Sequence, residues 1–147
     1  MTAHDFMEKF RLMLEDTQSG ILATTDSEGY PNMRYMTPTL VPGKDGLLYA
    51  VTAQHFPKVT DIAKNSRVSW LFTAARTREV YSLRGLIRVI DNPRFKSEIL
   101  EQLGKGLETF WKLNEDPSLL VCLETVLESA EYFNPKTAEK SQVSFAS

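Results

Sequence analysis

Residues 32–52 read NMRYMTPTLVPGKDGLLYAVT, two β-prone runs on either side of a strong turn. The turn spans residues 42–46, PGKDG, whose proline and glycines are typical of turns rather than regular structure. The flanking runs, Asn32–Val41 and Leu47–Thr52, are rich in apolar, aromatic and β-branched residues. Pro38 indicates an edge position or a bulge in the first run, because proline cannot donate a backbone hydrogen bond. The segment therefore predicts two antiparallel strands.

Further strands and helices are predicted outward from this pair. Strands are expected at residues 21–25, 67–73, 79–90 and 119–133, with Gly85 as a possible bulge. Helices are expected over residues 3–18, from residue 56, and over residues 91–112. Gly104 and Gly106 weaken the last helix in its middle, where a kink or a split is expected.

The predicted elements define a mainly β fold. Six or so strands in local hairpins do not suit a parallel α/β sheet. They fit a closed or nearly closed antiparallel β-barrel with flanking helices. The 147 residues suit one domain, expected over residues 1–134, followed by a polar and frayed tail at residues 135–147.

Composition excludes several classes of function. The net charge of -2 gives no general attraction to nucleic acid or anionic lipid. No stretch approaches the roughly 20 apolar residues that a membrane-spanning helix needs, and the first ten residues do not resemble a signal peptide. The single cysteine, Cys122, excludes an internal disulfide and indicates a reducing compartment. A cytoplasmic location without membrane or nucleic-acid partners is therefore expected.

The end of the second strand, just before a helix begins, is a candidate anion site. Free backbone N–H groups and the helix dipole favour an anion there. A turn centred on Lys44 sets Arg34 roughly opposite Gln54, beside this point. Thr52 could donate a hydroxyl, Lys58 a point charge, and Arg34 a planar fork for phosphate oxygens. The alternative is that Arg34 and Lys58 are solvated charges on the barrel rims.

Several short runs recur in an order and spacing that point to a known family. They are PNMRYM at 31–36, LYAVT at 48–52, DIAKN at 61–65, SLRG at 82–85, VIDNP at 89–93 and AEYF at 130–133. With Lys58 between the second and third runs, this set resembles the pyridoxamine 5′-phosphate oxidase-like FMN-binding split barrels. Within that superfamily it is most similar to the general stress protein 26 type. The resemblance covers residues 20–134.

The resemblance implies a split-barrel homodimer with two FMN molecules in clefts between the subunits. In such proteins an arginine and a lysine bind the phosphate with help from a threonine, and a short backbone run lies against the flavin ring. The other subunit contributes from one strand and sometimes adds an aromatic side chain. The matching residues here are Arg34, Lys58 and Thr52 for the phosphate, Tyr35, Met36 and Thr37 for the ring, and Tyr81, Ser82 and Trp111 for the other subunit's part.

The sequence also departs from the family pattern. Asn65 is followed by Ser66, where the family often has Asn-Pro, and Phe133 replaces a tryptophan common in the final strand. The C-terminal extension of the true oxidases and an Arg-x-His-like substrate motif are both missing from the tail. The resemblance therefore supports FMN binding and argues against pyridoxamine phosphate oxidation.

Three functions remain open on the sequence alone. The leading hypothesis is an FMN-dependent oxidoreductase with an unknown small substrate or electron donor, in which the flavin supplies the electron chemistry. A non-catalytic flavin-binding stress, storage or sensor protein would need the same phosphate pocket. A split barrel that binds haem or deazaflavin is the third, and His55 would then gain importance. No catalytic residue is assigned, and two distant histidines offer no metal site.

Overall fold

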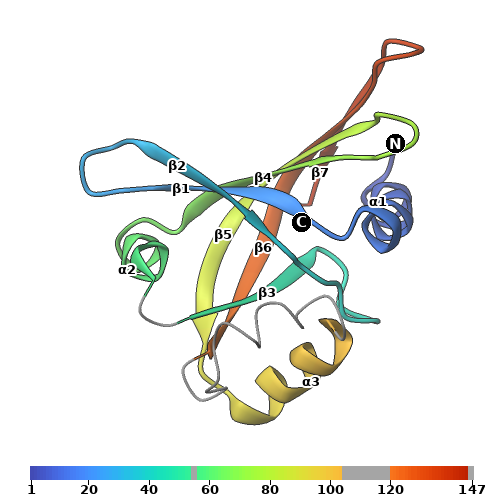
Figure 1. The fold of residues 1–147 in the computed structure, drawn as a ribbon. Coiled ribbons are helices and arrows are strands. Elements are labelled where there is room, and N and C mark those ends of the chain that lie inside the picture. Colours follow the sequence, from blue (N-terminus) through green and yellow to red (C-terminus); the bar gives the residue numbers. More distant parts are fainter. Residues whose placement is uncertain (54–55, 104–119, 146–147) are drawn as a thin grey trace.

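The computed structural model describes residues 1–53, 56–103 and 120–145, and these form a mainly β structure. Seven described strands make one antiparallel sheet, accompanied by three helices (Figure 1). The elements are α1 (Ala3–Thr17), β1 (Gly20–Thr25), β2 (Pro31–Met36), β3 (Leu47–Ala53), α2 (Pro57–Lys64), β4 (Arg67–Thr73), β5 (Val80–Ile90), α3 (Pro93–Leu103), β6 (Leu120–Asn134) and β7 (Glu139–Ser144). The predicted fold class is confirmed. None of the helices in the described ranges is long and apolar enough to cross a lipid bilayer.

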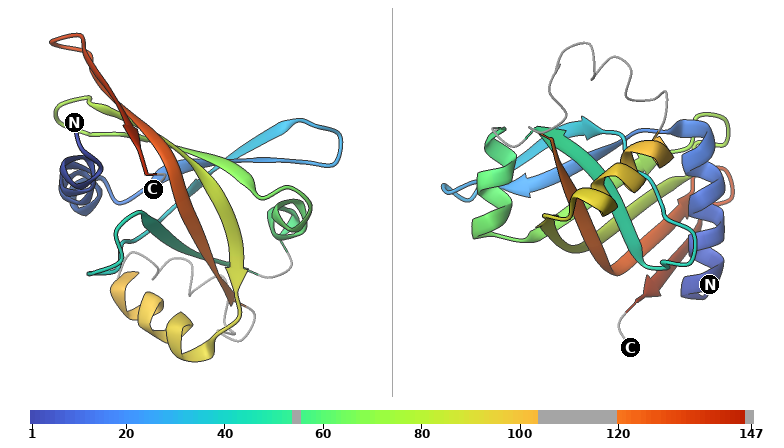
Figure 2. Two further views of the ribbon diagram at one scale, coloured as in Figure 1. Left: turned by 180° about the vertical axis from the view of Figure 1, so that it is seen from behind. Right: turned by 90° about the horizontal axis from the view of Figure 1, so that it is seen from below.

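The strand order explains the barrel. Along the sheet the strands run β2-β1-β4-β5-β6-β3, and β7 adds to β6. The sheet curls, so that β2 and β3, the strands at the two ends of this order, come round toward each other (Figures 1 and 2). One isolated bridge between Thr39 and Tyr49 joins the chain after β2 to β3, with N···O distances of 2.7 and 2.9 Å. Among the described residues this isolated bridge is the link between the two ends of the sheet, which fits a split barrel.

The prediction that residues 32–41 and 47–52 pair as a hairpin is wrong, because the two strands share only one isolated bridge among the described residues. β2 ends at Met36 and pairs with β1, and β3 pairs with β6. The bridge of Thr39 to Tyr49 keeps the register of a turn centred on residue 44, but pairing does not continue from it. Pro38 next to the bridge has no N–H to extend the ladder.

A local turn explains why β2 pairs with β1 instead. The Asp26 carboxylate accepts hydrogen bonds of 3.0 Å from the backbone N–H groups of Glu28 and Tyr30. Gly29 has φ of +88°, which a glycine adopts without strain. These contacts fold the chain back immediately, so that the two adjacent strands form a tight hairpin before β3 is reached.

Two apolar cores lie on opposite faces of the sheet. Leu48 packs in the first core and its neighbour Tyr49 in the second, since successive strand residues point to opposite faces. The first core takes in the apolar face of α1, where Phe10 contacts the Phe72 ring at 5.0 Å between centroids. The second core lies under α3, where Phe95 contacts Tyr49 at 5.0 Å. The predicted apolar stripe of the first helix is confirmed as core packing.

The C-terminal expectations are partly corrected. Residues 139–144 do not fray, because β7 pairs with β6 along its length and Val143 is buried in the first core. Their polar sequence hid this strand, since only one of its side chains reaches the core. The predicted helix at residues 91–112 is confirmed over Pro93–Leu103, and its remainder, with Gly104 and Gly106, lies outside the described residues.

The irregularity expected at Gly85 is present, but the extra residue of the bulge, Glu128, lies in the partner strand β6 rather than in β5. The register shifts between Arg84 and Gly85, and a Cβ at residue 85 would lie 2.3 Å from the backbone oxygen of Val126. We expect Gly85→Ala to lower the free energy of unfolding by roughly 2–4 kcal/mol, because backbone must move to admit the methyl group. Urea denaturation measures this, with the exposed neighbour changed in Arg84→Ala as the control. Equal stability of the two variants would contradict this close approach.

Candidate functional site

Arg34 is fixed by the β1–β2 hairpin. It lies opposite Leu22 of β1, whose side chain is fully buried, so that Arg34 points toward the inner side of the sheet. Its Nη1 donates to the Thr24 hydroxyl at 2.8 Å and to the Leu22 carbonyl at 3.2 Å. Both acceptors belong to β1. The guanidinium is therefore held against the neighbouring strand rather than extended into solvent.

The other edge of the Arg34 guanidinium is available. Nε and Nη2 make no hydrogen bond to the residues that the structure describes, and the side chain is in no ion pair with them. Burial lowers the pKa of Arg34, and the negative charge of Asp61 on α2 partly offsets this. An arginine stays protonated under such a shift. The site thus presents a charged fork suited to a carboxylate or a phosphate.

Lys58 places a second positive charge beside Arg34. It lies in the first turn of α2, is 8% exposed, and its Nζ is 4.3 Å from the centroid of the Phe56 ring. Burial and the charge of Arg34 together lower the pKa of Lys58 to about 8. Within the described ranges no carboxylate forms an ion pair with it. Two like charges held together without a close counterion are typical of an anion site.

Thr52 and the start of α2 flank these cations less directly. Thr52 is 1% exposed near the end of β3, and the structure gives its hydroxyl no hydrogen bond to Arg34 or Lys58. Gln54 and His55, between β3 and α2, lie outside the described residues. Phe56 at the N-cap of α2 supplies no side-chain hydrogen bond, and the helix dipole there favours an anion.

The three residues expected near the flavin ring lie on different faces. Tyr35 is 79% exposed on the outer face of β2, while Met36 is half-buried against the first core. Thr37 follows the strand and lines a pocket. These three residues directly follow Arg34, at the end of β2 and just beyond it.

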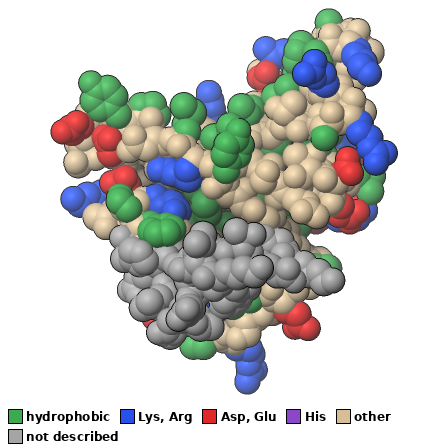
Figure 3. All heavy atoms as spheres, viewed as in Figure 1, with side chains coloured by type: hydrophobic (Ala, Val, Ile, Leu, Met, Phe, Trp, Pro, Cys, Tyr) green, Lys and Arg blue, Asp and Glu red, His purple; other side chains and the backbone are tan. Residues whose placement is uncertain are grey.

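The outer face that carries Tyr35 is apolar. In the strand register Tyr35 lies opposite Ile21, and Ile21 lies opposite Leu71 of β4, which is 40% exposed. Met33, on the same face of β2, is 71% exposed. Figure 3 shows hydrophobic side chains gathered over this hairpin in the view of Figure 1. We name Met33, Tyr35, Ile21 and Leu71 the outer apolar row.

The residues expected to serve the other subunit differ in accessibility. Tyr81 is buried, with its ring 5.8 Å from Phe6 and 5.4 Å from Tyr132 between centroids, so that its side chain packs inside its own barrel. Ser82 is half-exposed and lies opposite Leu71 on the outer face. Trp111 lies outside the described residues. Of these positions, the described structure leaves only Ser82 with a side chain that can reach a neighbouring molecule.

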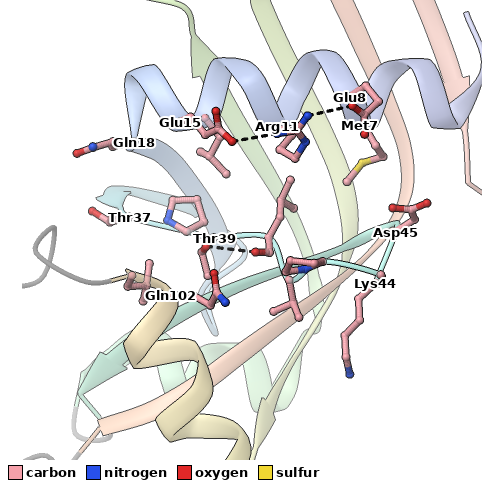
Figure 4. A pocket seen from close by; sticks show the side chains of 17 residues that line it. Met7, Glu8, Arg11, Glu15, Gln18, Thr37, Thr39, Lys44, Asp45 and Gln102 are labelled. Carbon is pink, nitrogen blue, oxygen red and sulfur yellow. Dashed lines mark hydrogen bonds and ion pairs between the residues drawn. The ribbon is translucent and has the colours of Figure 1, made fainter.

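A pocket of about 650 Å³ lies between α1, residues 37–45 and the end of α3 (Figure 4). Its α1 wall carries Arg11, which forms ion pairs of 3.0 Å with both Glu8 and Glu15. Thr37 belongs to its lining, whereas Arg34, Thr52 and Lys58 do not. The pocket is therefore a separate space that meets the predicted site only at Thr37.

Two residues at the cation pair were not anticipated from the sequence. Thr24 accepts the hydrogen bond from Arg34, and Asp61 lies close enough to Arg34 to affect its pKa. The signal for Thr24 was a polar residue two positions after Leu22, on the buried face of a strand. Asp61 follows Lys58 by three residues on α2, which places both on one side of the helix.

Comparisons with known proteins agree with this fold. Residues 5–146 match the family model described as "Pyridoxamine 5′-phosphate oxidase like". No curated protein matches the chain by sequence.

Solved structures with the same fold include proteins of different described function. A general stress protein 26-related protein of the pyridoxine phosphate oxidase family from Clostridium acetobutylicum has a TM-score of 0.77 at 17% identity, over 96% of this chain and 95% of its own. An FMN-binding protein related to pyridoxamine 5′-phosphate oxidase from Nostoc punctiforme has a TM-score of 0.71 at 13% identity, over 97% of each chain. A haem-binding protein from Mycobacterium smegmatis has a TM-score of 0.74 at 15% identity, over 93% of this chain and 57% of its own. These likenesses show the split-barrel fold.

The electrostatic coupling of the two cations can be measured directly. We expect the Lys58 ammonium to titrate near pH 8 in NMR spectra of the side chain, and Arg34→Gln to raise its pKa by removing a nearby positive charge. The pKa should stay below the ordinary lysine value of 10.5 in that variant, because burial persists. Arg84→Gln changes an exposed arginine of β5 that forms no ion pair with the described residues, and serves as the control. A Lys58 that titrates above pH 10 in the unchanged protein would contradict the arrangement.

Proposed function

The chain belongs to the pyridoxamine 5′-phosphate oxidase-like family, and from this premise we propose that it binds FMN by the phosphate at Arg34 and Lys58. The observation that carries the proposal is the pair of adjacent cations, one of them buried, with no ion-paired carboxylate among the described residues. The similar fold of the FMN-binding Nostoc protein supports it.

The cation pair suits a phosphate ester in particular. A phosphate presents several oxygens, so it can accept from the Nε–Nη2 edge of Arg34 and from the Lys58 ammonium at once. Its negative charge offsets the repulsion and burial that lower the pKa of Lys58. The uncapped start of α2 adds a favourable dipole. Thr52 would assist from the end of β3.

We propose an oxidoreductase as the activity of the bound protein. The flavin would supply the electron transfer, and the chain would supply its position and electrostatics. With the phosphate at Arg34, the backbone of Tyr35, Met36 and Thr37 would extend along the ring. Thr37 also lines the pocket beside α1, which gives a small electron donor or acceptor a route to that ring.

Two other functions stay as alternatives. A flavin-binding protein without turnover, used in storage or sensing, would need the same cation pair. Steady-state assays with reduced nicotinamide and other donors separate it from an enzyme, since FMN would then bind without being reduced at a useful rate. Haem is favoured by one observation, the similar fold of the haem-binding protein from Mycobacterium smegmatis. Deazaflavin remains a further possibility for this barrel.

An absorption spectrum decides between the cofactors. The purified protein is recorded before and after incubation with FMN, and separately with haemin, followed by desalting. We expect retained flavin bands after FMN and no retained Soret band after haemin. A retained Soret band without flavin binding would contradict the proposal.

Substitutions at the cation pair test the phosphate site. We expect Arg34→Ala and Lys58→Ala each to weaken FMN binding by about 10- to 150-fold, because each removes a charged hydrogen bond worth about 1.5–3 kcal/mol. Riboflavin, which lacks the phosphate, should bind the variants and the unchanged protein alike. Fluorescence titration measures both ligands, with the exposed Arg84→Ala as the matched control. Unchanged FMN affinity in both variants would remove these residues from the site.

We also propose that the protein is a homodimer with the cofactor at the subunit interface. The outer apolar row supports this, because large exposed apolar side chains in one row mark an association surface. A two-fold dimer is the commonest symmetric assembly. Ser82 lies beside this row and would face the second copy.

The dimer proposal predicts a dissociating variant. Tyr35→Glu puts a charge into the outer apolar row, and we expect it to shift the protein to a monomer in light scattering and to weaken FMN retention. Tyr30→Glu changes an exposed tyrosine at the tip of the same hairpin and is the control. An unchanged protein that is monomeric while it holds FMN tightly would contradict the proposal.

A further inference from the structure

We propose that Thr24 is a positioning residue of the phosphate site. Its hydroxyl, together with the Leu22 carbonyl, orients the Arg34 guanidinium so that the Nε–Nη2 edge is presented to the anion. The inference rests on the proposed function, because the anion is taken to be the FMN phosphate. It names a residue that would not touch the cofactor and would act through Arg34.

The burial of Thr24 is the first observation. Its residue is 1% exposed on the inner face of β1, two positions after the fully buried Leu22. A hydroxyl buried in this way needs a hydrogen-bond partner, since leaving it unpaired costs free energy. The partner is Nη1 of Arg34, at 2.8 Å.

The distribution of the Arg34 donors is the second observation. A guanidinium carries five N–H donors, two of them on Nη1. Nη1 donates to the Thr24 hydroxyl and to the Leu22 carbonyl, which uses both. Nε and Nη2 remain without partners among the described residues, and they form the edge that grips two phosphate oxygens at once. The hydrogen bonds to β1 therefore select which edge faces the site.

The chemistry of the anchor is the third observation. Thr24 and the Leu22 carbonyl are uncharged acceptors, so they fix the guanidinium without neutralising it. A carboxylate in the same position would compete with a phosphate for Arg34. Asp61 influences the pKa of Arg34 but forms no ion pair with it within the described part of the chain. The full charge of Arg34 is thereby kept for the ligand.

Preorganisation is what this anchor contributes. A long arginine side chain loses rotamer freedom when it binds, and fixing it in advance reduces that loss. The β1–β2 hairpin holds Thr24 and Arg34 on adjacent strands, so the geometry exists before any ligand arrives. The charge of Arg34 adds to burial in lowering the pKa of Lys58, so both cations would act on the same anion.

The test compares Thr24→Val with Thr24→Ser. We expect Thr24→Val to weaken FMN binding by about tenfold while riboflavin affinity stays the same, and Thr24→Ser to restore FMN binding. The ratio of the two affinities is the readout, because a general loss of packing would weaken both ligands together. Should Thr24→Val fail to fold, Thr24→Ala removes the same hydroxyl and is measured in the same way.

A matched control is available in the same barrel. Thr125 is also 1% exposed, and its hydroxyl accepts a hydrogen bond of 3.1 Å from the Trp70 indole. Thr125→Val therefore removes a buried hydroxyl with one partner, and we expect it to leave the FMN to riboflavin ratio unchanged. A Thr24→Val protein with the ratio of the unchanged protein would overturn the inference.

A second readout separates this inference from the FMN proposal. Nitrogen-15 relaxation of the Arg34 Nε reports the order of the guanidinium with no ligand present. We expect a rigid Nε in the unchanged protein and in Thr24→Ser, and a more mobile one in Thr24→Val. Equal order in all three proteins would overturn the role of Thr24. A failure of FMN to bind the unchanged protein would count against the proposed function, and the relaxation measurement would still decide on Thr24.

Discussion

The proposed phosphate site depends on the buried ammonium of Lys58 and the Arg34 guanidinium. Placing two positive charges together in a poorly solvated site is unfavourable, as the lowered pKa of Lys58 shows. Arg88, by contrast, has a carboxylate partner, Glu124, at 2.9 Å. A pair of cations with no ion-paired carboxylate in the described part of the chain is suited to bind an anion, and this is the basis of the proposed function.

The fold brings the pair together from separate elements. A tight turn at Asp26 folds β2 onto β1 and so places Arg34 on the inner side of one end of the sheet. The bridge between Thr39 and Tyr49 then connects that end to β3, at the other end of the strand order. Because α2 follows β3 along the chain, closing the barrel brings Lys58 near Arg34.

The sequence predicted the elements well and their pairing less well. The strand limits at residues 67–73 and an irregularity opposite Gly85 could be predicted, because alternation and a glycine inside a strand are local signals, although the extra residue lies in β6. The ladder of β2 with β3 was mispredicted, since a turn at residue 44 looked as strong as the turn at Asp26, whose local hydrogen bonds pair β2 with β1. β7 was missed because a polar strand at the edge of a sheet buries almost nothing.

Some residues of the candidate site could be predicted from the sequence, and others could not. The strand-end position and the family resemblance both indicated Arg34 and Lys58, and in the structure the charge of Arg34 helps to lower the pKa of Lys58. Thr24 escaped notice because its partner is not adjacent in sequence and only the hairpin register reveals it. The buried position of Tyr81 could not be foreseen, because alternation does not say which face of a curled strand meets α1.

A crystal structure of the protein with FMN would show whether the phosphate binds at Arg34 and Lys58. We expect the phosphate to contact the Nε and Nη2 atoms of Arg34 and the Lys58 ammonium, while Nη1 keeps its hydrogen bonds to β1. FMN with its phosphate in the pocket beside α1, or at any place away from these two cations, would contradict the account.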